Sequence, residues 1–491
     1  MDAADTGLLN LQPMTIFLGL AAIFVVWLIG RPKKNLPPGP PRLPLIGTML
    51  SFNFADYTHP HKLNSIIDKY GEIFTLAFMG KYVIYLNSYE VIKEAMLDKP
   101  LEFIDRNIAH GYSFSRIHQG ITARDYNDGA KGIRTKSLNI FRDLGVGRKV
   151  MEELITQEAK ELCDSFGSHD GQAFDPGYVT TAAVCNVILQ TTASKRYDYN
   201  DAELLQLIDN LDLYPQSVHI CLLLDKAPFL RVIPKVRQLF SDVIKSSSGV
   251  TRFMWKHAKE AVSNSPRGER SNFTEAFIAD ADERERAMFG ELLRDFALAG
   301  TETTAGSLKW SLLELANNPD IQEKLHAAIH DVIHDRNYRL SDNIPYLDAF
   351  VWEIQRLGSV VPVGVVHSVS AAGDGQLGGY TIPKKDTFFY CNIYAVHRNK
   401  KTWGDPEVFR PERFINAKGE YVKHPHVIPF GIGKRSCLAE LLARQELYIF
   451  TAMVSQRFKI LREEGVEQIG KKPSVGFART PRPFKIRVVP R

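Results

Sequence analysis

Residues 430–440 read Phe-Gly-Ile-Gly-Lys-Arg-Ser-Cys-Leu-Ala-Glu, and this stretch decides how the fold of the whole chain is interpreted. Gly431 and Gly433 let the backbone turn tightly and come close to a flat ligand. Cys437 stands after this loop and directly before a predicted helix, Leu438–Phe450. At that junction, backbone N–H groups and the positive end of the helix dipole favour a thiolate.

The residues around Cys437 leave several interpretations open. One cysteine among five is usually a small buried hydrophobic side chain. A Gly-x-Gly turn before a helix can hold a phosphate, and a single cysteine can be a hydrolase nucleophile, although no His or Asn partner is indicated. Arg435 favours a further interpretation, since a thiolate, a close backbone and a carboxylate-binding arginine are what a haem needs on its proximal side.

The complete spacing, F-x-x-G-x-R-x-C over residues 430–437, is far more specific than any of its parts. It resembles the cysteine loop of the cytochrome P450 family. The resemblance implies that Cys437 is the thiolate ligand of the iron of haem b. It also implies that Phe430 and Gly431 belong to the cofactor-binding loop and that Arg435 binds a haem carboxylate.

Length and composition limit the other classes of protein. The chain has 491 residues, 44% of them hydrophobic, which is ample for a large core, and a net charge of +5, which does not suggest nucleic-acid binding. Length alone predicts about three domains. No C-x-x-C pair occurs, so the cysteines indicate a reducing compartment rather than a disulfide framework or structural zinc: Cys163, Cys185, Cys221, Cys391 and Cys437.

The N-terminus carries a separate signal. Met14–Ile29 is an apolar run that Leu8 extends upstream, close to the ~20 residues that span a bilayer. Basic residues follow at 31–34 while acidic ones precede the run, so the body of the protein is expected in the cytosol. No basic segment precedes the run and no Ala-x-Ala site follows it, which disfavours a cleaved signal peptide. We therefore expect a transmembrane signal anchor at 1–30.

A proline-rich segment and one large unit follow the expected anchor. Residues 37–41 read Pro-Pro-Gly-Pro-Pro, so a semi-rigid linker is predicted at 31–47. Since no low-complexity break or large repeat divides the remainder, residues 48–491 are predicted to form one domain. Its fold class is expected to be mainly α with a minor β region.

Local patterns predict several elements of this domain. Ile73–Phe78 and Tyr82–Leu86 are short apolar runs around a glycine, typical of a hairpin. Pro234 and Pro319 suit helix starts. Helical periodicity predicts helices at Glu152–Phe166, Asp201–Leu213, Val236–Lys256 and Glu291–Leu315.

Residues 299–304, Ala-Gly-Thr-Glu-Thr-Thr, interrupt the apolar helix Glu291–Leu315. A glycine inside a helix costs about 1 kcal/mol relative to alanine. The plain explanation is close helix packing at Gly300, with threonines bonding back to carbonyl groups. An acid next to an alcohol can also relay protons, and the motif resembles the oxygen-activation motif of the family. The resemblance implies that Glu302 and Thr303 are catalytic and deliver protons during O₂ cleavage.

Glu353 and Arg356 stand three residues apart, which makes them neighbours on a helix. Most such pairs lie at the surface and contribute little. Together with Arg413, however, they resemble the buried Glu-Arg-Arg network that supports the cysteine loop in cytochromes P450. A structural role in holding the haem site is implied.

Haem carboxylates need cationic or hydrogen-bonding partners. The resemblance implies Arg435, His367 and Arg134 for this role. Microsomal members of the family have a W-x-x-x-R pair, and here Arg134 matches while Ala130 occupies the tryptophan position. Ala439 stands where the family most often has glycine. One propionate contact and the packing beside the ligand are therefore expected to differ.

The resemblance extends from about residue 36 to the C-terminus and implies a haem-thiolate monooxygenase. Such an enzyme inserts one oxygen atom from O₂ into a lipophilic substrate of steroid, fatty-acid or xenobiotic type. Electrons are expected from NADPH through NADPH–cytochrome P450 reductase, with cytochrome b5 as a further donor. Lys434, Arg435 and Arg444 either form a basic docking face for such an acidic partner or are simply solvated. A single-pass location in the endoplasmic reticulum membrane is implied, with the catalytic domain on the cytosolic face.

Two rival functions are consistent with the same fold. A haem-thiolate isomerase or dehydratase rearranges an oxygenated lipid without O₂, and the Glu302–Thr303 pair disfavours it. A non-enzymatic membrane haem or lipid sensor is the second rival.

The substrate pocket is expected to be apolar, with walls from Phe103–Arg124, Leu205–Phe240, Phe296–Thr304, Val361–Val366 and Val475–Phe477.

Overall fold

The computed structural model describes residues 17–19, 21, 35–43, 47–48, 60–78, 80–106, 120–216, 221, 224–225, 228–265, 270–474 and 478–491. Most of the expected anchor at 1–30 lies outside these residues, as do residues 107–119 and 475–477 of the expected pocket walls. Within the described part, no helix combines the length and the apolar character needed to cross a membrane.

The described chain is mainly helical with a small β component, as the sequence predicts. The longer helices are α5 (Asp128–Asp143), α6 (Lys149–Gly167), α7 (Gly177–Ala193), α8 (Ala202–Gln216), α10 (Pro234–Asn264), α12 (Glu283–Asn317), α13 (Pro319–Ile333), α14 (Pro345–Gly358) and α17 (Glu440–Arg457). The shorter helices and turns are η2 (Pro60–Leu63), α2 (Asn64–Tyr70), α3 (Tyr89–Lys93), η3 (Glu94–Asp98), η4 (Pro228–Val232), α11 (Phe273–Ala279), α15 (Ile393–His397), α16 (Lys400–Trp403) and η5 (Pro411–Phe414).

The strands of the described chain form three small sheets. The strands are β1 (Ile73–Phe78), β2 (Lys81–Leu86), β3 (Gly375–Leu377), β4 (Tyr380–Ile382), β5 (Thr387–Cys391), β6 (Phe458–Arg462) and β7 (Ile486–Pro490). The sheets pair β1 with β2 and β5, β3 with β4, and β6 with β7. The predicted hairpin is confirmed as β1–β2, and β5 joins it in parallel, with Ile84 opposite Phe389. The described part of the expected linker lies against this sheet, because Thr75 N–H donates to the carbonyl of Pro38 at 2.7 Å.

The predicted long helices are confirmed as α6, α8, α10 and α12, and Pro234 and Pro319 begin α10 and α13. Helix α12 begins eight residues before the expected start because Asp282 and Glu285 form a capping box there. Helix α17 begins at Glu440 rather than at Leu438, since Ala439 has the non-helical φ of −101° and ψ of 25°.

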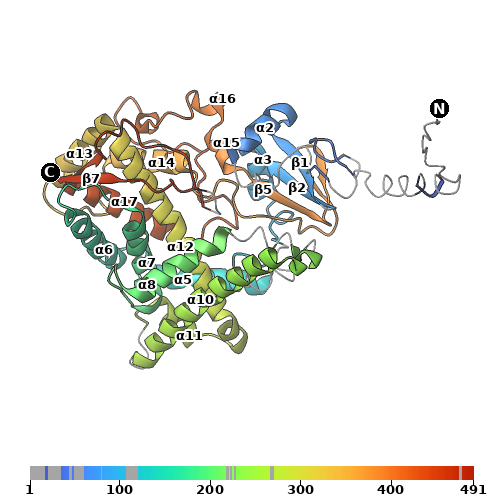
Figure 1. Cartoon of the computed structure of the whole chain (residues 1–491), viewed down its shortest axis with the longest axis horizontal. Coiled ribbons are helices and arrows are strands. Elements are labelled where there is room, and N and C mark those ends of the chain that lie inside the picture. The colour runs from blue at the N-terminus through green and yellow to red at the C-terminus, as the bar shows by residue number, and fades with distance from the viewer. Residues whose placement is uncertain are drawn as a thin grey trace, which may run out of the picture.

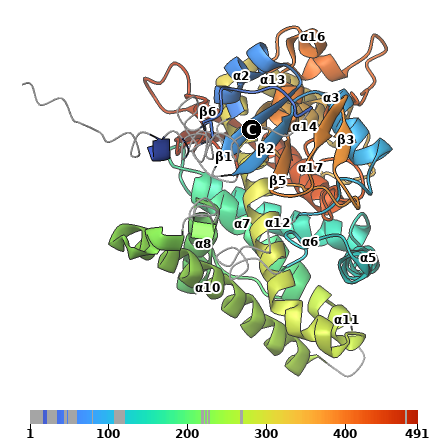
Figure 2. The ribbon, with the colours of Figure 1, turned by 90° about the vertical axis from the view of Figure 1, so that its right-hand side faces the viewer.

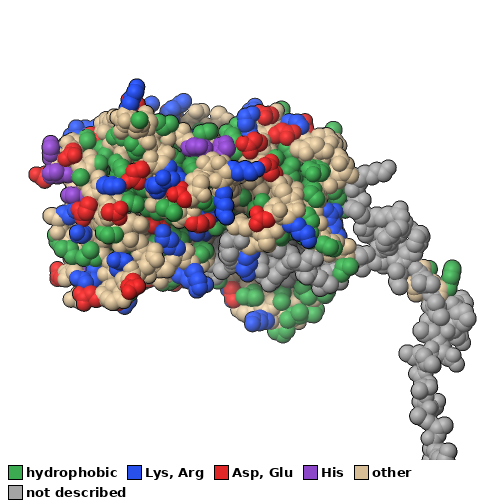
Figure 3. All heavy atoms as spheres, turned by 90° about the horizontal axis from the view of Figure 1, so that it is seen from above, with side chains coloured by type: hydrophobic (Ala, Val, Ile, Leu, Met, Phe, Trp, Pro, Cys, Tyr) green, Lys and Arg blue, Asp and Glu red, His purple; other side chains and the backbone are tan. Residues whose placement is uncertain are grey.

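Helix α12 runs through the middle of the helical part, while the β1–β2–β5 sheet lies at one side (Figures 1 and 2). The largest core cluster joins α12 to α6, α7, α14 and α17. At Gly300 of α12, a Cβ would lie 2.6 Å from Ile188 Cδ1 of α7, so the close packing considered for this glycine is present. On the face in Figure 3, basic and acidic side chains are interspersed with hydrophobic ones.

Candidate functional site

A cavity of about 440 Å³ lies between α12, the loop that carries Cys437 and the start of α17. All predicted site residues except Glu302 line it: Cys437, Arg435, His367, Arg134, Phe430, Gly431 and Thr303. The expected walls at 296–304 and Val361–Val366 are confirmed. No described residue of the expected wall at Leu205–Phe240 is part of the cavity lining. Cys221 and Phe240 instead belong to an apolar cluster with Ala123 and Val366, which do line the cavity.

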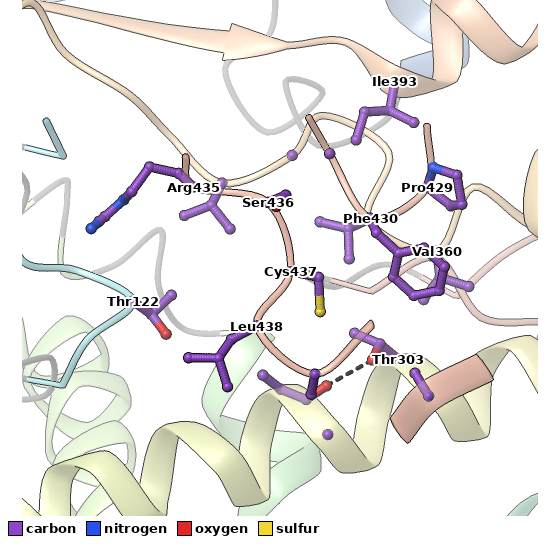
Figure 4. Close-up of a pocket in the computed structure, with 18 of the residues that line it drawn as sticks. Thr122, Thr303, Val360, Ile393, Pro429, Phe430, Arg435, Ser436, Cys437 and Leu438 are labelled. Carbon is purple, nitrogen blue, oxygen red and sulfur yellow. Dashed lines mark hydrogen bonds between the residues drawn. The ribbon is translucent and has the colours of Figure 1, made fainter. Parts of the chain in front are cut away.

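The cysteine loop is shaped by its two glycines. Gly431 and Gly433 have φ values of 70° and 83°, a region that other residues rarely adopt. A Cβ at Gly433 would also overlap the carbonyl oxygen of Met96, so the close backbone approach here is to η3. Cys437 N–H donates to the carbonyl of Phe430 at 2.8 Å and closes the loop. Figure 4 shows the sulfur of Cys437 pointing from this loop toward α12.

The free thiol of Cys437 does not prefer the thiolate form. Cys437 is exposed to the cavity, but the protein atoms around the sulfur desolvate it and thereby raise its pKa; the N–H of Ala439 and the charge of Arg134 lower the pKa less, and Glu440 raises it further. The helix dipole that the sequence suggested has less effect because α17 begins only at Glu440. A metal cation at the sulfur would reverse this balance, since a coordinating thiol loses its proton.

The predicted carboxylate-binding residues come together beside the loop. Arg134 Nη2 donates to the carbonyl of Ser436 at 2.7 Å, and Arg435 Nη2 donates to that of Arg124 at the same distance. Burial first, and then repulsion between the two, lowers the pKa of Arg435 to about 10. Since Arg435 lines the cavity, it lies inside rather than on the proposed docking face.

His367 lines the same cavity as these arginines. Its ring nitrogen Nδ1 lies 3.1 Å from the carbonyl oxygen of Phe103, so Nδ1 carries the proton and donates. Burial, followed by the charges of Arg106 and Arg435, holds the pKa of His367 well below its usual value. The imidazole is therefore neutral, and a carboxylate near Nε2 would raise its pKa.

Arg106 is a member of this group that sequence reasoning missed. It is 5% exposed, lines the cavity and donates from Nη1 to the carbonyls of Val365 and Val366 at 3.0 and 2.7 Å. Its Nε is buried without a partner among the described residues. Burial, and repulsion from Arg435 and Arg134, hold its pKa well below the usual value. The signal in the sequence is the charged pair Asp105-Arg106 directly after the apolar residues Phe103 and Ile104.

These observations fit a flat cofactor with two carboxylates. Three buried or half-buried arginines repel one another at one end of a cavity, and one keeps an unpartnered N–H. Anionic groups placed there would satisfy the free donor and offset the repulsion. The thiol of Cys437 lines the same cavity. The residues present therefore fit a thiolate-ligated haem.

The variant Arg106→Gln tests this carboxylate-binding role. Loss of a charge-assisted hydrogen bond costs about 1.5–3 kcal/mol, so we expect haem to leave roughly tenfold or more faster. The measurement is haem transfer to apomyoglobin, followed by absorbance. Arg142→Gln, at an exposed arginine of α5, is the control and should match the wild type. An unchanged rate in Arg106→Gln would contradict the role.

The side chains of Glu302 and Thr303 on α12 point in different directions. Thr303 lines the cavity and donates from Oγ1 to the carbonyl of Ala299 at 2.7 Å (dashed line in Figure 4). Glu302 is half-buried outside the cavity lining, and burial and the negative charge of Asp212 on α8 hold its pKa well above the usual value. Consecutive helical residues are turned by about 100°, which explains the separation. The proton-delivery role of Glu302 stays a prediction.

The predicted Glu-Arg-Arg network is confirmed as a buried structure. Arg356 and Glu353 are both 0% exposed and form two parallel bonds of 2.7 and 2.8 Å, and Arg413 Nε donates to Glu353 at 3.0 Å. The remaining N–H groups of Arg356 donate to the carbonyls of His397, Pro406 and Val408. All five donors of this guanidinium are therefore used.

The network reaches the cysteine loop through His397. Arg356 Nη1 donates to the carbonyl of His397 at 2.8 Å, and His397 Nε2 accepts the N–H of Ile428 at 2.9 Å. Burial and the charges of Arg356 and Arg398 hold the pKa of His397 well below its usual value, so the ring is neutral and Nε2 is free to accept. Since Ile428 lies just before the loop and lines the cavity, the network fixes one end of the loop.

Comparisons with known proteins agree with this site. A family model described as Cytochrome P450 matches residues 37–488. Cytochrome P450 2J1 of Oryctolagus cuniculus is 32% identical over 98% of this chain and 97% of its own length. Cytochrome P450 2D6 of Pan troglodytes is 31% identical over 99% of this chain and 100% of its own. The chain therefore belongs to the cytochrome P450 family of haem-thiolate monooxygenases, and its relatives are of the animal type.

Proposed function

We propose that this enzyme holds haem b through Cys437 and inserts one oxygen atom from O₂ into a lipophilic substrate of steroid, fatty-acid or xenobiotic type. The observation that carries the proposal is that one cavity is lined by the thiol of Cys437, a group of buried or half-buried arginines and Thr303. The rest of its lining is largely apolar, with valines at 360–366 and aromatic rings at Phe296 and Phe388, which favours a hydrophobic substrate.

Each polar residue has a separate task in this proposal. A thiolate-held haem supplies O₂ binding and O–O cleavage when bound. Arg106, Arg134, Arg435 and His367 orient it through its carboxylates. The hydroxyl of Thr303 offers a proton-carrying group beside the reaction space, and Glu302 supplies protons from the other side of α12. The apolar lining excludes bulk water.

We further propose the electron source and the location. The apolar run Met14–Ile29 and the basic residues after it support an enzyme anchored in the endoplasmic reticulum membrane by residues 1–30, with its catalytic domain on the cytosolic face. Electrons would come from NADPH through NADPH–cytochrome P450 reductase, with cytochrome b5 as a second donor. Exposed Lys434 and half-buried Arg444, which lies 5.4 Å over the ring of Trp352, are candidates for the docking face.

The reaction class is tested with purified holoenzyme and reductase. The expected result is hydroxylated or epoxidised product from steroids, fatty acids or sterol precursors, detected by mass and dependent on both NADPH and O₂. Turnover of an oxygenated lipid without NADPH would instead support the isomerase or dehydratase. A red-shifted carbon monoxide band without turnover of any lipophile would support the haem sensor.

Thr303→Ala tests the hydroxyl in the cavity. We expect roughly tenfold less product per NADPH, with the difference appearing as hydrogen peroxide. This is less than the ~10²–10⁴ of a full general acid, because water can take the place of the hydroxyl. Thr135→Ala is the matched control, since this exposed threonine of α5 makes the same bond one turn back, to Lys131 at 2.9 Å. Wild-type coupling in Thr303→Ala would contradict the role.

A further inference from the structure

Arg479 lies in the chain between β6 and β7, and neither the sequence nor the proposed function provides a task for it. It is half-buried and is not part of the cavity lining. Its guanidinium lies 4.6 Å over the ring of Trp310 on α12 and 5.6 Å over that of Tyr394 on α15. Desolvation, and then repulsion from Arg398, lowers the pKa of Arg479 to about 10, so it stays charged at neutral pH. A charged side chain held by rings of two helices calls for an explanation.

The guanidinium of Arg479 caps the C-terminal end of α14. Its Nη1 donates to the carbonyl of Leu357 at 3.1 Å and to that of Gly358 at 2.6 Å. Carbonyl groups in the last turn of a helix have no partner within the helix, and the negative end of the helix dipole favours a cation there. Arg398 Nη2 also donates to the carbonyl of Leu357, at 2.7 Å. Two arginines therefore hold the end of α14.

The chain turns sharply where α14 ends. Ser359 has a φ of 40° and a ψ of 58°, a left-handed conformation that residues other than glycine rarely adopt. It is buried, its N–H donates to the carbonyl of Gln355 at 3.0 Å, and its hydroxyl donates to that of Arg356 at 2.7 Å. Such a conformation persists only where the surrounding structure holds it. The bonds at the end of α14 therefore fix the direction in which residues 360–366 leave the helix.

Val360 is the first residue after this turn, and it lines the cavity (Figure 4). The backbone N–H of Arg479 donates to the carbonyl of Val360 at 2.7 Å, and the carbonyl of Arg479 accepts Nε1–H of Trp310 at 2.9 Å. A Cβ at Gly306 of α12 would lie 3.4 Å from Val360 Cγ1, so Val360 also packs closely against the helix that carries Thr303. The backbone and the guanidinium of Arg479 thus hold the chain on both sides of the turn.

We propose that Arg479 is a positioning residue that fixes Val360 in the cavity wall and thereby selects which carbon of a lipophilic substrate is oxidised, which rests on the proposed function. A substrate held mainly by apolar contacts is oriented by the shape of the wall. The methyl groups of a fixed valine exclude orientations that would bring other carbons to the reaction space. Since a single methylene group in an apolar pocket discriminates about tenfold or more, a displaced Val360 would change the products.

Hydrogen–deuterium exchange of the holoenzyme tests the positioning without turnover. We expect the amides of residues 359–366 to exchange roughly tenfold faster in Arg479→Gln, which corresponds to the loss of about one net hydrogen bond. Arg482→Gln is the matched control, because this exposed arginine of the same segment donates only to the carbonyl of Pro473, at 3.4 Å. It should exchange like the wild type. The carbon monoxide band should stay normal in both variants.

The ratio of products tests the effect on the substrate. Dodecanoic acid and testosterone are the probes, because each offers several carbons of similar reactivity, so the ratio of hydroxylated products reports orientation. With reductase and NADPH, we expect the ratio of the two main products to change roughly five- to tenfold in Arg479→Gln. Arg482→Gln should keep the wild-type ratio. A merely structural role would lower the melting temperature and the total turnover without changing the ratio.

A double variant tests the route through Val360. Val360→Ala should change the ratio by itself, and adding Arg479→Gln to it should change the ratio further by less than about twofold, because the side chain that Arg479 positions is already truncated. Effects that multiply in the double variant would contradict this route. Arg479→Lys keeps the cation near Trp310 and should give intermediate ratios. It carries the test if the glutamine variant does not fold, and a wild-type ratio in it would then overturn the inference.

The outcomes separate this inference from the proposed function. Wild-type exchange or a wild-type product ratio in Arg479→Gln overturns the inference while the monooxygenase stands. Absence of NADPH-dependent product from the wild type overturns the proposed function and the selection of a carbon with it, and the exchange rates then still report whether Arg479 holds the segment of Val360.

Discussion

Replacing Cys437 with serine or alanine is expected to abolish monooxygenase turnover. In the proposed enzyme the thiolate both holds the iron and donates the electron density that favours O–O cleavage. Serine is a poor ligand in this place because its hydroxyl keeps its proton, and alanine offers no ligand at all. We expect product formation below detection and loss of the red-shifted carbon monoxide band in both variants, measured on haem-reconstituted protein.

Cys391 provides a matched control for this prediction. It is a second thiol in the lining of the same cavity, it is buried, and burial raises its pKa to about 12. Cys391→Ser should keep the carbon monoxide band and most of the turnover, because Cys391 ends strand β5 and has no glycine loop around it. Wild-type activity in Cys437→Ser or Cys437→Ala would refute the assignment of the ligand.

The parts of the site that the sequence predicts are those that depend on local geometry. The glycines at 431 and 433 and Cys437 lie within seven residues, so the loop folds largely through its own backbone. Glu353 and Arg356 are neighbours on one helix, and their spacing predicts contact. Burial of that pair, however, depends on Trp403 and the chain at 406–413, and only a resemblance to a known family anticipates it.

The parts that the sequence does not predict depend on distant packing. Arg106 reaches the cavity because it bonds to carbonyls at 365 and 366, more than 250 residues away. Glu446 lines the cavity from α17, a helix whose buried face is defined by α6, α12, α13 and α14 together. Helix α7 is buried on nearly all sides and lacks the periodicity that marks a surface helix, so no pattern indicates it.

Distant packing also explains why the sequence did not predict the direction of the Glu302 side chain or the pKa of Cys437. The direction of the Glu302 side chain follows from the helical turn of about 100° per residue, but which side of α12 faces the cavity depends on the packing of the entire domain. The pKa of Cys437 depends on desolvation by the protein around the sulfur, which a short motif does not contain. Local chemistry therefore identified the ligand candidate, and tertiary structure determined its protonation.

Glu353→Ala is expected to have the second-largest effect, on stability rather than on chemistry. Removing one partner of a buried ion pair leaves an uncompensated charge and costs about 3–5 kcal/mol. Here two arginines lose their carboxylate partner, because Arg356 and Arg413 both bond to Glu353. The N–H of Arg410 loses its acceptor as well. We expect a lower urea midpoint and faster haem loss.

The effect on haem loss follows from the position of the Glu353–Arg356–Arg413 network. Arg356 donates to the carbonyl of His397, whose ring accepts the N–H of Ile428 before the cysteine loop, so a displaced guanidinium loosens the loop that carries Cys437.

A control variant separates this effect from the loss of any charged pair. Glu153→Gln removes an exposed pair with Lys149 and should change the free energy of unfolding by less than about 0.5 kcal/mol. Replacing Glu353 and Arg356 together with leucine should restore part of the midpoint, since no unpaired charge then remains in that pair. An unchanged midpoint and haem-loss rate in Glu353→Ala would mean that the loop is held by its own backbone alone.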